Sequence, residues 1–362
     1  MASIHDLPTP ALLLDLDVLE RNLHRMSGRA AALGVAMRPH IKTHKSLEVA
    51  ALQKALGIRG ITVSTLYEAR VFAEAGYDDL TWAFPVILTR LAEVEELADR
   101  VTLRLVVDSP EAVEALEALG RPLHVWLKVD CGYHRAGVDP ESPEALALAR
   151  RLAESPTLIF DGLLTHSGHA YHGPGRAEVA AVAEQERSVM AGFAERLRSE
   201  GIEVPEVSVG STPALSAAQS LAGVTEIRPG NYCFHDFTQV AIGSCAVVDC
   251  AVTVLSSVVS CRPGAGHAVV DAGALAMSKD LGPDGSASLG EVFLDYGSGT
   301  LDSEARLTSL SQEHGILSAP RPVGSRVRIL PNHSCLTAAM FDEYAVVRGE
   351  EVVDRWKIWR GR

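Results

Sequence analysis

The sequence predicts an α/β fold in which a closed (β/α)8 TIM-like barrel is followed by a β-rich C-terminal domain. Two patterns carry this prediction. Strand-like apolar segments alternate eight times with amphipathic helical segments between Val35 and Ile227, which is typical of the barrel. From about Phe237 the pattern changes to β-rich segments separated by Gly/Pro turns, which indicates a second, all-β domain. No GxGxxG follows a predicted strand, which argues against an open doubly wound sheet.

The elements follow in order. Ala11–Leu14 is a short apolar strand that we expect to join the β domain, and Asp17 is the expected N-cap of a helix that ends near Leu33. The barrel strands are predicted near Val35–Ile41, Gly60–Ser64, Leu80–Phe84, Val101–Val107, His124–Val129, Phe160–Thr165, Glu206–Val209 and Val224–Ile227. Helices are predicted at Ser46–Leu56, Thr65–Ala75, Pro110–Leu119, Pro143–Ala153 and Arg176–Glu200.

The β domain is predicted to contain strands at Ala246–Ser260, His267–Asp271, Arg326–Leu330, Tyr344–Val347 and Glu351–Trp359. The predicted domains are therefore an N-terminal strand within residues 1–17, a barrel over residues 18–236, and a β domain over residues 237–362.

Composition and charge exclude several classes of protein. A chain of 362 residues with 47% hydrophobic residues can bury a large core. A formal charge of -13 argues against nucleic acid as a partner. Because the apolar runs are interrupted by polar residues and no signal-like segment begins the chain, we expect a soluble, cytoplasmic protein with no membrane partner and a small-molecule substrate. The six cysteines lack a CxxC spacing and are expected to be reduced, with all but Cys335 buried.

Lys42 is the first candidate for chemistry. It lies where the first barrel strand ends, in Arg38-Pro39-His40-Ile41-Lys42-Thr43-His44-Lys45. The carboxyl ends of barrel strands meet at one rim, where active sites are found. Taken alone, a lysine in such a stretch is more often an exposed turn residue. The residues at the other strand ends therefore decide the interpretation.

Small and hydroxylated residues follow the last two barrel strands. Gly210-Ser211-Thr212-Pro213 follows the seventh strand and opens a helix, and Gly230-Asn231 follows the eighth. In barrels of this kind a phosphate commonly binds on these two loops. Gly-Ser-Thr-Pro by itself is also a good N-cap. Together with a lysine at the same rim, a phosphate site indicates pyridoxal phosphate (PLP), whose aldehyde needs a lysine, or a sugar phosphate bound by a Schiff-base aldolase.

Two further loops and one pair of residues are candidates for binding and catalysis. The fifth strand ends in a glycine-containing loop, Asp130 to Gly137, and the sixth in Thr165 to His172, with Tyr171, His166, His169 and His172. In Asn332-His333-Ser334-Cys335, an extended backbone would project His333 and Cys335 to one side, where an imidazole and a thiolate suit zinc. Such an H-x-C is more often a buried cysteine beside a turn histidine, and two ligands do not complete a tetrahedral shell.

These residues together resemble a known family. The matching motifs, in chain order, are Pro39 to Lys45, Asp130 to Gly137, Arg228-Pro229-Gly230-Asn231-Tyr232, Asp271-Ala272-Gly273 with Ser278-Lys279-Asp280, Gln312-Glu313-His314-Gly315, and Pro331 to Thr337. They resemble the D-serine dehydratase / D-threonine aldolase family, whose members have the alanine-racemase-type fold, a PLP barrel followed by a β domain. The resemblance extends over nearly the whole chain.

The resemblance implies a role for each matching residue. Lys42, rather than Lys45, carries the cofactor in Schiff-base linkage, Arg135 lies near the phenolic oxygen of the cofactor, and Tyr171 lies near its ring. The phosphate-binding positions are Ser211, Thr212, Gly230 and Asn231, with Tyr232 beside them. His333 and Cys335 match the metal pair, and their H-x-C form is similar to the zinc-dependent dehydratase branch; manganese or magnesium is the alternative metal. The resemblance also implies a homodimer.

The function that follows is a PLP- and metal-dependent lyase acting on D-3-hydroxy amino acids. D-serine dehydratase, which forms pyruvate and ammonia by β-elimination with Lys42 as the base, is the first hypothesis. A D-threonine aldolase that yields glycine and an aldehyde, with one of His166, His169 or His172 as the base, is the second, and a D-3-hydroxyaspartate lyase is also compatible. A non-catalytic PLP-binding protein ranks lower, because the chain retains a β domain with a candidate metal pair.

Overall fold

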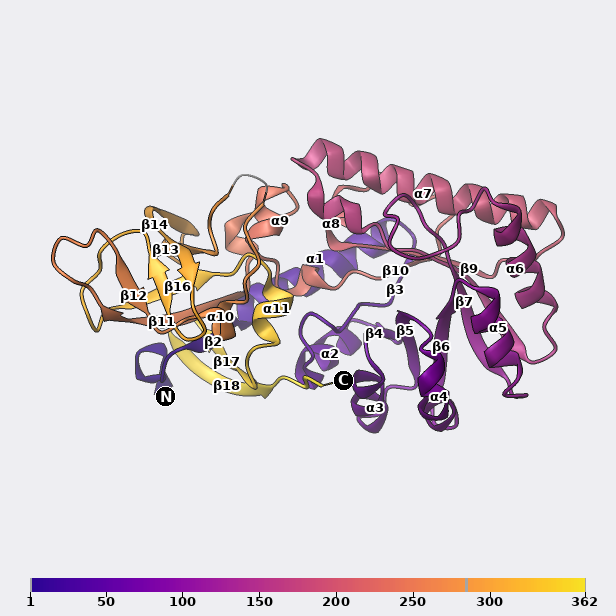
Figure 1. Ribbon diagram of the computed structural model, residues 1–362, viewed down its shortest axis with the longest axis horizontal. Helices are drawn as coiled ribbons and strands as arrows, with labels where there is room; N and C mark the ends of the chain where they lie inside the picture. Colours follow the sequence, from indigo (N-terminus) through magenta and orange to yellow (C-terminus); the bar gives the residue numbers. More distant parts are fainter. Residues whose placement is uncertain (1, 284–285, 362) are drawn as a thin grey trace. The chain divides into compact units, whose positions relative to one another are not determined.

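The computed structural model describes residues 2–283 and 286–361, and the chain divides into two compact units. The barrel unit consists of Met26–Lys42 and Gln53–Gly230, with Gly361. The β unit consists of the residues up to Arg25, Thr43–Leu52 and Asn231–Arg360. Figure 1 shows the barrel unit mainly in indigo to magenta and most of the β unit in orange to yellow.

The barrel unit contains the eight parallel strands that the sequence predicts. Their order in the sheet is β3-β10-β9-β8-β7-β6-β5-β4. The bounds are β3 (Ala36–Met37), β4 (Ile61–Val63), β5 (Asp79–Pro85), β6 (Thr102–Val107), β7 (Leu123–Lys128), β8 (Leu158–Leu164), β9 (Glu206–Val209) and β10 (Glu226–Ile227). The predicted α/β barrel is therefore confirmed, although several strands are shorter than their apolar segments.

The barrel closes through the residues that follow β3. A parallel bridge joins His40 to Thr62 of β4. The Thr62 N–H donates to the Pro39 carbonyl (2.8 Å), and the Ile41 N–H donates to the Thr62 carbonyl (2.9 Å). Because Lys42 comes directly after these bonds, its backbone leaves the barrel at the carboxyl rim.

Helices alternate with these strands as expected. They are α1 (Leu16–Ala32), α2 (Leu47–Ala55), α3 (Leu66–Glu74), α4 (Leu91–Ala98), α5 (Pro110–Glu117), α6 (Pro143–Glu154), α7 (Arg176–Ser199) and α8 (Thr212–Ala217), with short 3-10 turns η2 (Leu88–Arg90) and η3 (Gly168–His172). The prediction that Asp17 caps α1 is wrong. The helix begins at Leu16, and the Asp15 carboxylate accepts from the Val18 N–H at 3.0 Å, so Asp15 satisfies this terminal donor and Asp17 lies inside the first turn.

The β unit is built on a largely antiparallel sheet. Its strands are β1 (Ala2–Ser3), β2 (Ala11–Asp15), β11 (Val252–Ser260), β12 (Ala268–Val270), β13 (Gly290–Asp295), β14 (Thr300–Leu310), β15 (Gly315–Leu317), β16 (Arg326–Leu330), β17 (Glu343–Arg348) and β18 (Glu351–Lys357). β16 pairs with both β13 and β11, so that β11, β12, β15, β14, β13 and β16 form a closed ring. β2 lies between β11 and β17, which places the N-terminal strand in this sheet.

The remaining elements of the β unit are short. They are η1 (Ile4–Asp6), η4 (Asn231–Cys233), α9 (Phe237–Ala241), η5 (Val247–Asp249), α10 (Ala274–Met277) and α11 (Ser334–Ala338). Two predictions need correction here. The strand expected from Ala246 begins only at Val252, because η5 precedes it, and β13, β14 and β15 were not predicted. The cysteines are all free thiols, but Cys245 and Cys261 are only partly buried.

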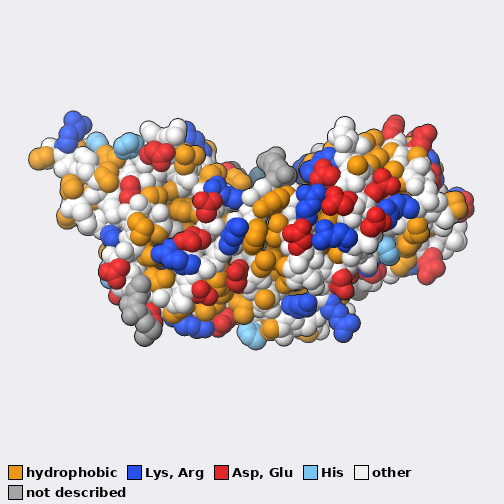
Figure 2. All heavy atoms as spheres, turned by 90° about the horizontal axis from the view of Figure 1, so that it is seen from below, with side chains coloured by type: hydrophobic (Ala, Val, Ile, Leu, Met, Phe, Trp, Pro, Cys, Tyr) orange, Lys and Arg blue, Asp and Glu red, His pale blue; other side chains and the backbone are white. Residues whose placement is uncertain are grey.

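Each unit has its own apolar interior. In the barrel, Val106, Trp126 and Leu164 form a buried cluster between β6, β7 and β8. In the β unit, Leu13, Leu255 and Val347 belong to a buried cluster contributed by β2, β11 and β17. Among the described residues, no helix has the length and apolar character that crossing a membrane requires. On the face shown in Figure 2, acidic and basic side chains are interspersed.

Charged side chains fill the amino end of the barrel. Arg38 donates to Glu226 Oε2 at 2.7 Å and makes a two-pronged pair with Asp79, at 2.8 and 2.9 Å. Arg104 also donates to Asp79 Oδ1 at 2.8 Å. Burial by itself would raise the pKa of Asp79, but the two guanidinium groups outweigh it and hold the pKa below its usual range.

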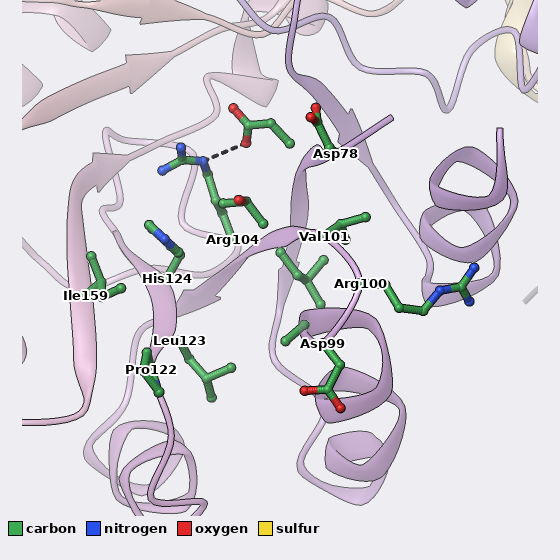
Figure 3. Close-up of a pocket in the computed structure, with 13 residues that line it drawn as sticks. Asp78, Asp99, Arg100, Val101, Arg104, Pro122, Leu123, His124 and Ile159 are labelled. Carbon is green, nitrogen blue, oxygen red and sulfur yellow. Dashed lines mark hydrogen bonds and ion pairs between the residues drawn. The ribbon is translucent and has the colours of Figure 1, made fainter. Parts of the chain in front are cut away.

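A surface pocket lies at the same end of the barrel. Figure 3 shows Arg104 and His124 pointing into the pocket from β6 and β7, with Asp78 and Asp99 at its edge. Arg104 and His124 both contact Asp161 Oδ1, at 2.8 and 2.7 Å. Arg104, His124 and Asp161 pair with one another, and catalysis in such barrels takes place at the opposite rim. We therefore interpret the charged side chains at the amino end as a network that stabilises the barrel.

We predict that Asp79→Asn lowers the free energy of unfolding by about 2 kcal/mol. This loss is smaller than that for breaking a fully buried ion pair, because Asp79 is partly exposed. A carboxylate whose pKa is depressed on folding stabilises the fold above its unfolded pKa of about 3.9 and loses this contribution as the pH falls through the folded pKa. The variant should therefore show a shallower loss of stability below about pH 4. Urea unfolding between pH 3 and 7 measures both effects. Asp99→Asn, which removes an exposed partner of Arg121, is the matched control, and equal curves for the two variants would contradict the prediction.

Candidate active site

The structure places six of the predicted site residues on loops at the carboxyl rim of the barrel unit. They are Lys42 after β3, Arg135 after β7, Tyr171 in η3 after β8, Ser211 and Thr212 after β9, and Gly230 after β10. The other four lie in the β unit: Asn231 and Tyr232 in η4, His333 before α11, and Cys335 inside it.

His166 joins several of the barrel loops. Its Nδ1 lies 2.7 Å from the carbonyl oxygen of Gly210. A carbonyl only accepts hydrogen bonds, so Nδ1 carries the proton and Nε2 is left as an acceptor. Burial lowers the pKa of His166 well below its usual value, and the positive charges of Lys42 and Arg135 lower it further. Burial and these charges favour the neutral imidazole of His166, which contacts residues of the loops after β7 and β9.

An aromatic side chain orients Arg135. The Arg135 guanidinium lies over the Tyr133 ring, 4.9 Å from its centroid. The same ring packs against His166, with centroids 6.2 Å apart, and stacks on His169 at 6.1 Å. A side chain at Gly168 would collide with this ring, so glycine is required there. Arg135, His166 and His169 therefore form one group packed around Tyr133.

The loop after β9 forms the predicted small-residue turn. Gly210 has φ of +148°, and a Cβ there would lie 2.8 Å from the Arg228 backbone nitrogen, so only glycine fits. Ser211 Oγ accepts from the Ala214 N–H at 3.3 Å and thereby caps α8. Ser211 and Thr212 are buried and supply hydroxyl groups at the strand end. These hydroxyls, with a lysine at the same rim, fit the phosphate and aldehyde of PLP.

Three buried charged residues near this rim were not assigned roles from the sequence: Lys128, Glu186 and Arg228. Burial, reinforced by Arg228 and Arg135, lowers the pKa of Lys128 to about 8. Arg228 donates to Ser208 Oγ and to the Thr165 carbonyl. Lys128 and Arg228 lie at the ends of predicted strands, and this position could have marked them as candidate site residues. Glu186 lies within α7, where nothing in the sequence distinguishes it from other helix glutamates.

In the β unit, His333 and Cys335 lie together. The sequence prediction assumed an extended segment, but Cys335 belongs to the short helix α11 and only His333 is extended, as its N-cap residue. The His333 Nδ1 lies 2.9 Å from Asp280 Oδ2. Burial alone would lower the pKa of His333, but Cys335 and Asp280 raise it to about 11.

Polar side chains surround the Cys335 thiol. Thr43 Oγ1 lies 3.2 Å from Cys335 Sγ, and Asn231 Nδ2 donates to the same sulfur at 3.8 Å. Asn231 Nδ2 also donates to Asp236 Oδ2 at 2.7 Å, and Asp236 accepts from the Ser334 N–H at 2.9 Å. The side chain of Asn231, predicted at a phosphate position, is therefore engaged beside Cys335.

The pair fits a divalent metal ion by its chemistry. Asp280 binds Nδ1 of His333, which leaves Nε2 for a metal and reproduces the carboxylate–histidine–metal arrangement. In the described part of the chain no group of three or more His, Cys, Asp or Glu side chains is arranged to hold a metal. A metal bound by His333 and Cys335 therefore needs further ligands from solvent or substrate.

Comparison with protein families identifies the class of protein. The chain matches the family "Alanine racemase, N-terminal domain" over residues 14–236 and the family "Putative serine dehydratase domain" over residues 251–347. Together with the barrel and its lysine, these matches define a PLP enzyme of the alanine racemase fold, also called fold type III.

Individual relatives are similar over nearly their whole length. The D-threo-3-hydroxyaspartate dehydratase of Delftia sp. is 41% identical over 98% of both chains, and its solved structure has a TM-score of 0.94, at 40% identity and full coverage of both chains. The D-serine dehydratase of Dictyostelium discoideum is 35% identical over 98% of this chain and 97% of its own. The structure of D-threonine aldolase from Filomicrobium marinum has a TM-score of 0.87 at 31% identity, covering 98% of this chain and 96% of that one. The chain therefore belongs to the D-serine dehydratase / D-threonine aldolase family of PLP-dependent lyases, which confirms the resemblance seen in the sequence.

Proposed function

We propose that this protein is a metal-dependent PLP lyase that dehydrates D-3-hydroxy amino acids to a keto acid and ammonia. The observation that carries the proposal is the His333–Cys335 pair with Asp280 on the imidazole, because a thiol in this position is what the resemblance links to the dehydratase branch. Four dehydratases are among the similar relatives, and one similar solved structure is a cysteine mutant of a D-threo-3-hydroxyaspartate dehydratase in the metal-free form. D-serine and D-threo-3-hydroxyaspartate are the proposed substrates.

The residues predicted at the cofactor positions would hold PLP in this proposal. Lys42 binds it covalently, Arg135 lies at its phenolic oxygen and Tyr171 at its ring. The phosphate is held by Ser211, Thr212, Gly230 and Asn231, with Tyr232 beside them. When bound, PLP delocalises negative charge from Cα, and the metal ion acts as a Lewis acid toward a hydroxyl leaving group.

Lys42 is the proposed base: with PLP bound at this rim, its amine would accept the Cα proton of the substrate. Chain connectivity supports a joint role for this lysine and the metal pair. Thr43, the residue directly after Lys42, contacts Cys335 Sγ at 3.2 Å. The peptide bond between residues 42 and 43 therefore ties the proposed base to the segment that contacts the metal-binding thiol.

One observation favours retro-aldol cleavage as the second candidate. His166 is neutral, its Nδ1–H is engaged by Gly210, and Lys42 is the strongest charge acting on its ring. Such an imidazole has an acceptor nitrogen available to take a hydroxyl proton, which is the first step of Cα–Cβ cleavage. His172 is exposed, and His169 is stacked on Tyr133, so His166 is the best placed of the three histidines for this reaction.

The products distinguish the two candidates. Purified protein supplied with PLP and zinc should form keto acid and ammonia in equal amounts from D-serine or D-threo-3-hydroxyaspartate, with no activity on the L-isomers. D-Threonine should give no glycine. Glycine with an equal amount of aldehyde, and no keto acid, would replace dehydration by the retro-aldol reaction and assign the base to His166.

We predict that Lys42→Ala abolishes the visible absorbance of lysine-bound PLP and lowers turnover by at least about a thousandfold, because both the covalent link and the base are lost. Lys45→Ala, three residues further along the chain, is the matched control. It should retain the absorbance band and substantial turnover. Retention of the band in Lys42→Ala with loss in Lys45→Ala would reassign the cofactor lysine.

We predict that Asp280→Asn weakens metal binding by about 10- to 100-fold, because the amide no longer fixes the Nδ1–H form of His333 as a carboxylate does. Competition against a coloured zinc chelator measures the affinity without any substrate. The control is Asp342→Asn, an exposed carboxylate of the same unit that pairs only with Arg360 among the ion pairs described. Metal should also protect Cys335 from alkylation in the wild type; unprotected Cys335 would rule out its role as a ligand.

A further inference from the structure

A glutamate is buried where a helix faces the barrel. Glu186 lies on α7 and is only 2% exposed, on the same buried face as Val179, Ala183 and Met190. Glutamate is seldom buried unless its carboxylate is engaged. Its neighbours in sequence, Glu184 and Arg187, pair with each other near the surface. The usual role of a helix glutamate, to keep an exposed face soluble, therefore does not explain why Glu186 is present.

The carboxylate of Glu186 joins two loops of the carboxyl rim. Its Oε1 accepts from the Ser167 N–H at 3.0 Å and from the Gly210 N–H at 3.2 Å. Ser167 follows β8, and Gly210 follows β9, so one oxygen atom ties the ends of two adjacent strands. Burial raises the pKa of Glu186, while the bonds from Gly210 and Ser167 and the charge of Arg228 oppose that increase.

The bonded residues lead directly to the proposed cofactor site. Ser167 Oγ lies 3.2 Å from Ser211 Oγ. The peptide groups of Gly210 are held on both sides, the N–H by Glu186 and the carbonyl by His166 Nδ1 at 2.7 Å. The same backbone bond to His166 leaves Nε2 of that ring as an acceptor. Glu186 thus reaches both Ser211 and His166 through Gly210 and Ser167.

We propose that Glu186 is a positioning residue that fixes the loops after β8 and β9, so that Ser211 is held at the proposed phosphate site with His166 beside it. The inference rests on the proposed function, because it takes Ser211 as part of the phosphate site. In this proposal Glu186 acts through Ser167 and Gly210 and not by contact with the substrate or the cofactor. Its contribution is to satisfy two backbone donors inside the protein, where no water replaces a missing acceptor.

The geometry specifies which substitutions preserve this role. Both hydrogen bonds end on Oε1, so the amide oxygen of glutamine can accept both, whereas leucine fills a similar volume and accepts neither. Aspartate keeps the charge but is one methylene shorter and cannot reach both N–H groups from α7. Glu184→Gln changes an exposed glutamate two residues away on the same helix and serves as the control.

The experiment measures the dissociation constants of PLP and of pyridoxal, which lacks the phosphate, for the cofactor-stripped full chain. Glu186→Leu should weaken PLP binding about tenfold or more, because two buried donors lose their acceptor. Glu186→Gln should stay within about threefold of the wild type. Pyridoxal should be affected less than PLP, since it makes no use of the Ser211 loop. Glu184→Gln should bind both as the wild type does.

Thermal unfolding of each cofactor-stripped variant identifies loss of folding. If Glu186→Leu does not fold, Glu186→Asp provides the same comparison with Glu186→Gln and is expected to weaken PLP binding more than pyridoxal binding. The proposal would be overturned if Glu186→Leu bound PLP with unchanged affinity. It would also be overturned if Glu186→Gln bound PLP as weakly as Glu186→Leu does. Equal losses for PLP and pyridoxal would overturn it too, because a general structural role lowers both alike. A wild type that binds no PLP would instead refute the proposed function itself.

Discussion

Closure of the parallel barrel is the constraint on which the candidate site depends. Thr62 of β4 makes two backbone hydrogen bonds with the segment after β3: its N–H donates to the Pro39 carbonyl, and its carbonyl accepts from the Ile41 N–H. These bonds join the first and last strands in the sheet order, so the ring has no free edge and all strand carboxyl ends share one rim. Lys42 comes directly after the closing bonds. The position of Lys42, the lysine proposed to bind the cofactor, is therefore a consequence of how the barrel closes.

The two ends of the barrel use charge in different ways. At the amino end, Arg38 and Arg104 each bind carboxylates, so that the charges neutralise one another inside the protein. At the carboxyl rim, the charges that lower the pKa of His166 are all positive: Lys42, Arg135 and Lys128. These three positive charges suit the proposed cofactor phosphate and substrate carboxylate. The same fold thus provides a stabilising end and, opposite it, the rim that carries the candidate site.

The sequence predicted the barrel well because its strands are short apolar runs bounded by Gly, Pro and capping residues, which local patterns reveal. Thr65, Ser109 and Ser142 cap α3, α5 and α6 as such residues should. Local patterns were less informative in the β unit. β14 (Thr300–Leu310) alternates exposed and buried residues around a bulge, and β15 is three residues long, so neither presents a clear strand signal.

The residues that sequence reasoning left without a role share a physical property: their function depends on which distant group they contact. Asp280 was recognised only as part of a motif, because nothing in the sequence shows that its carboxylate meets His333, 53 positions away. Glu186 resembles any surface glutamate of a long helix until the structure shows two backbone donors ending on one of its oxygens. Lys42, His333 and Cys335 are different, because reactive side chains at a strand end or in a short motif are visible locally. Candidates for the groups that perform chemistry can thus be proposed from sequence, whereas the groups that hold them in place require the fold.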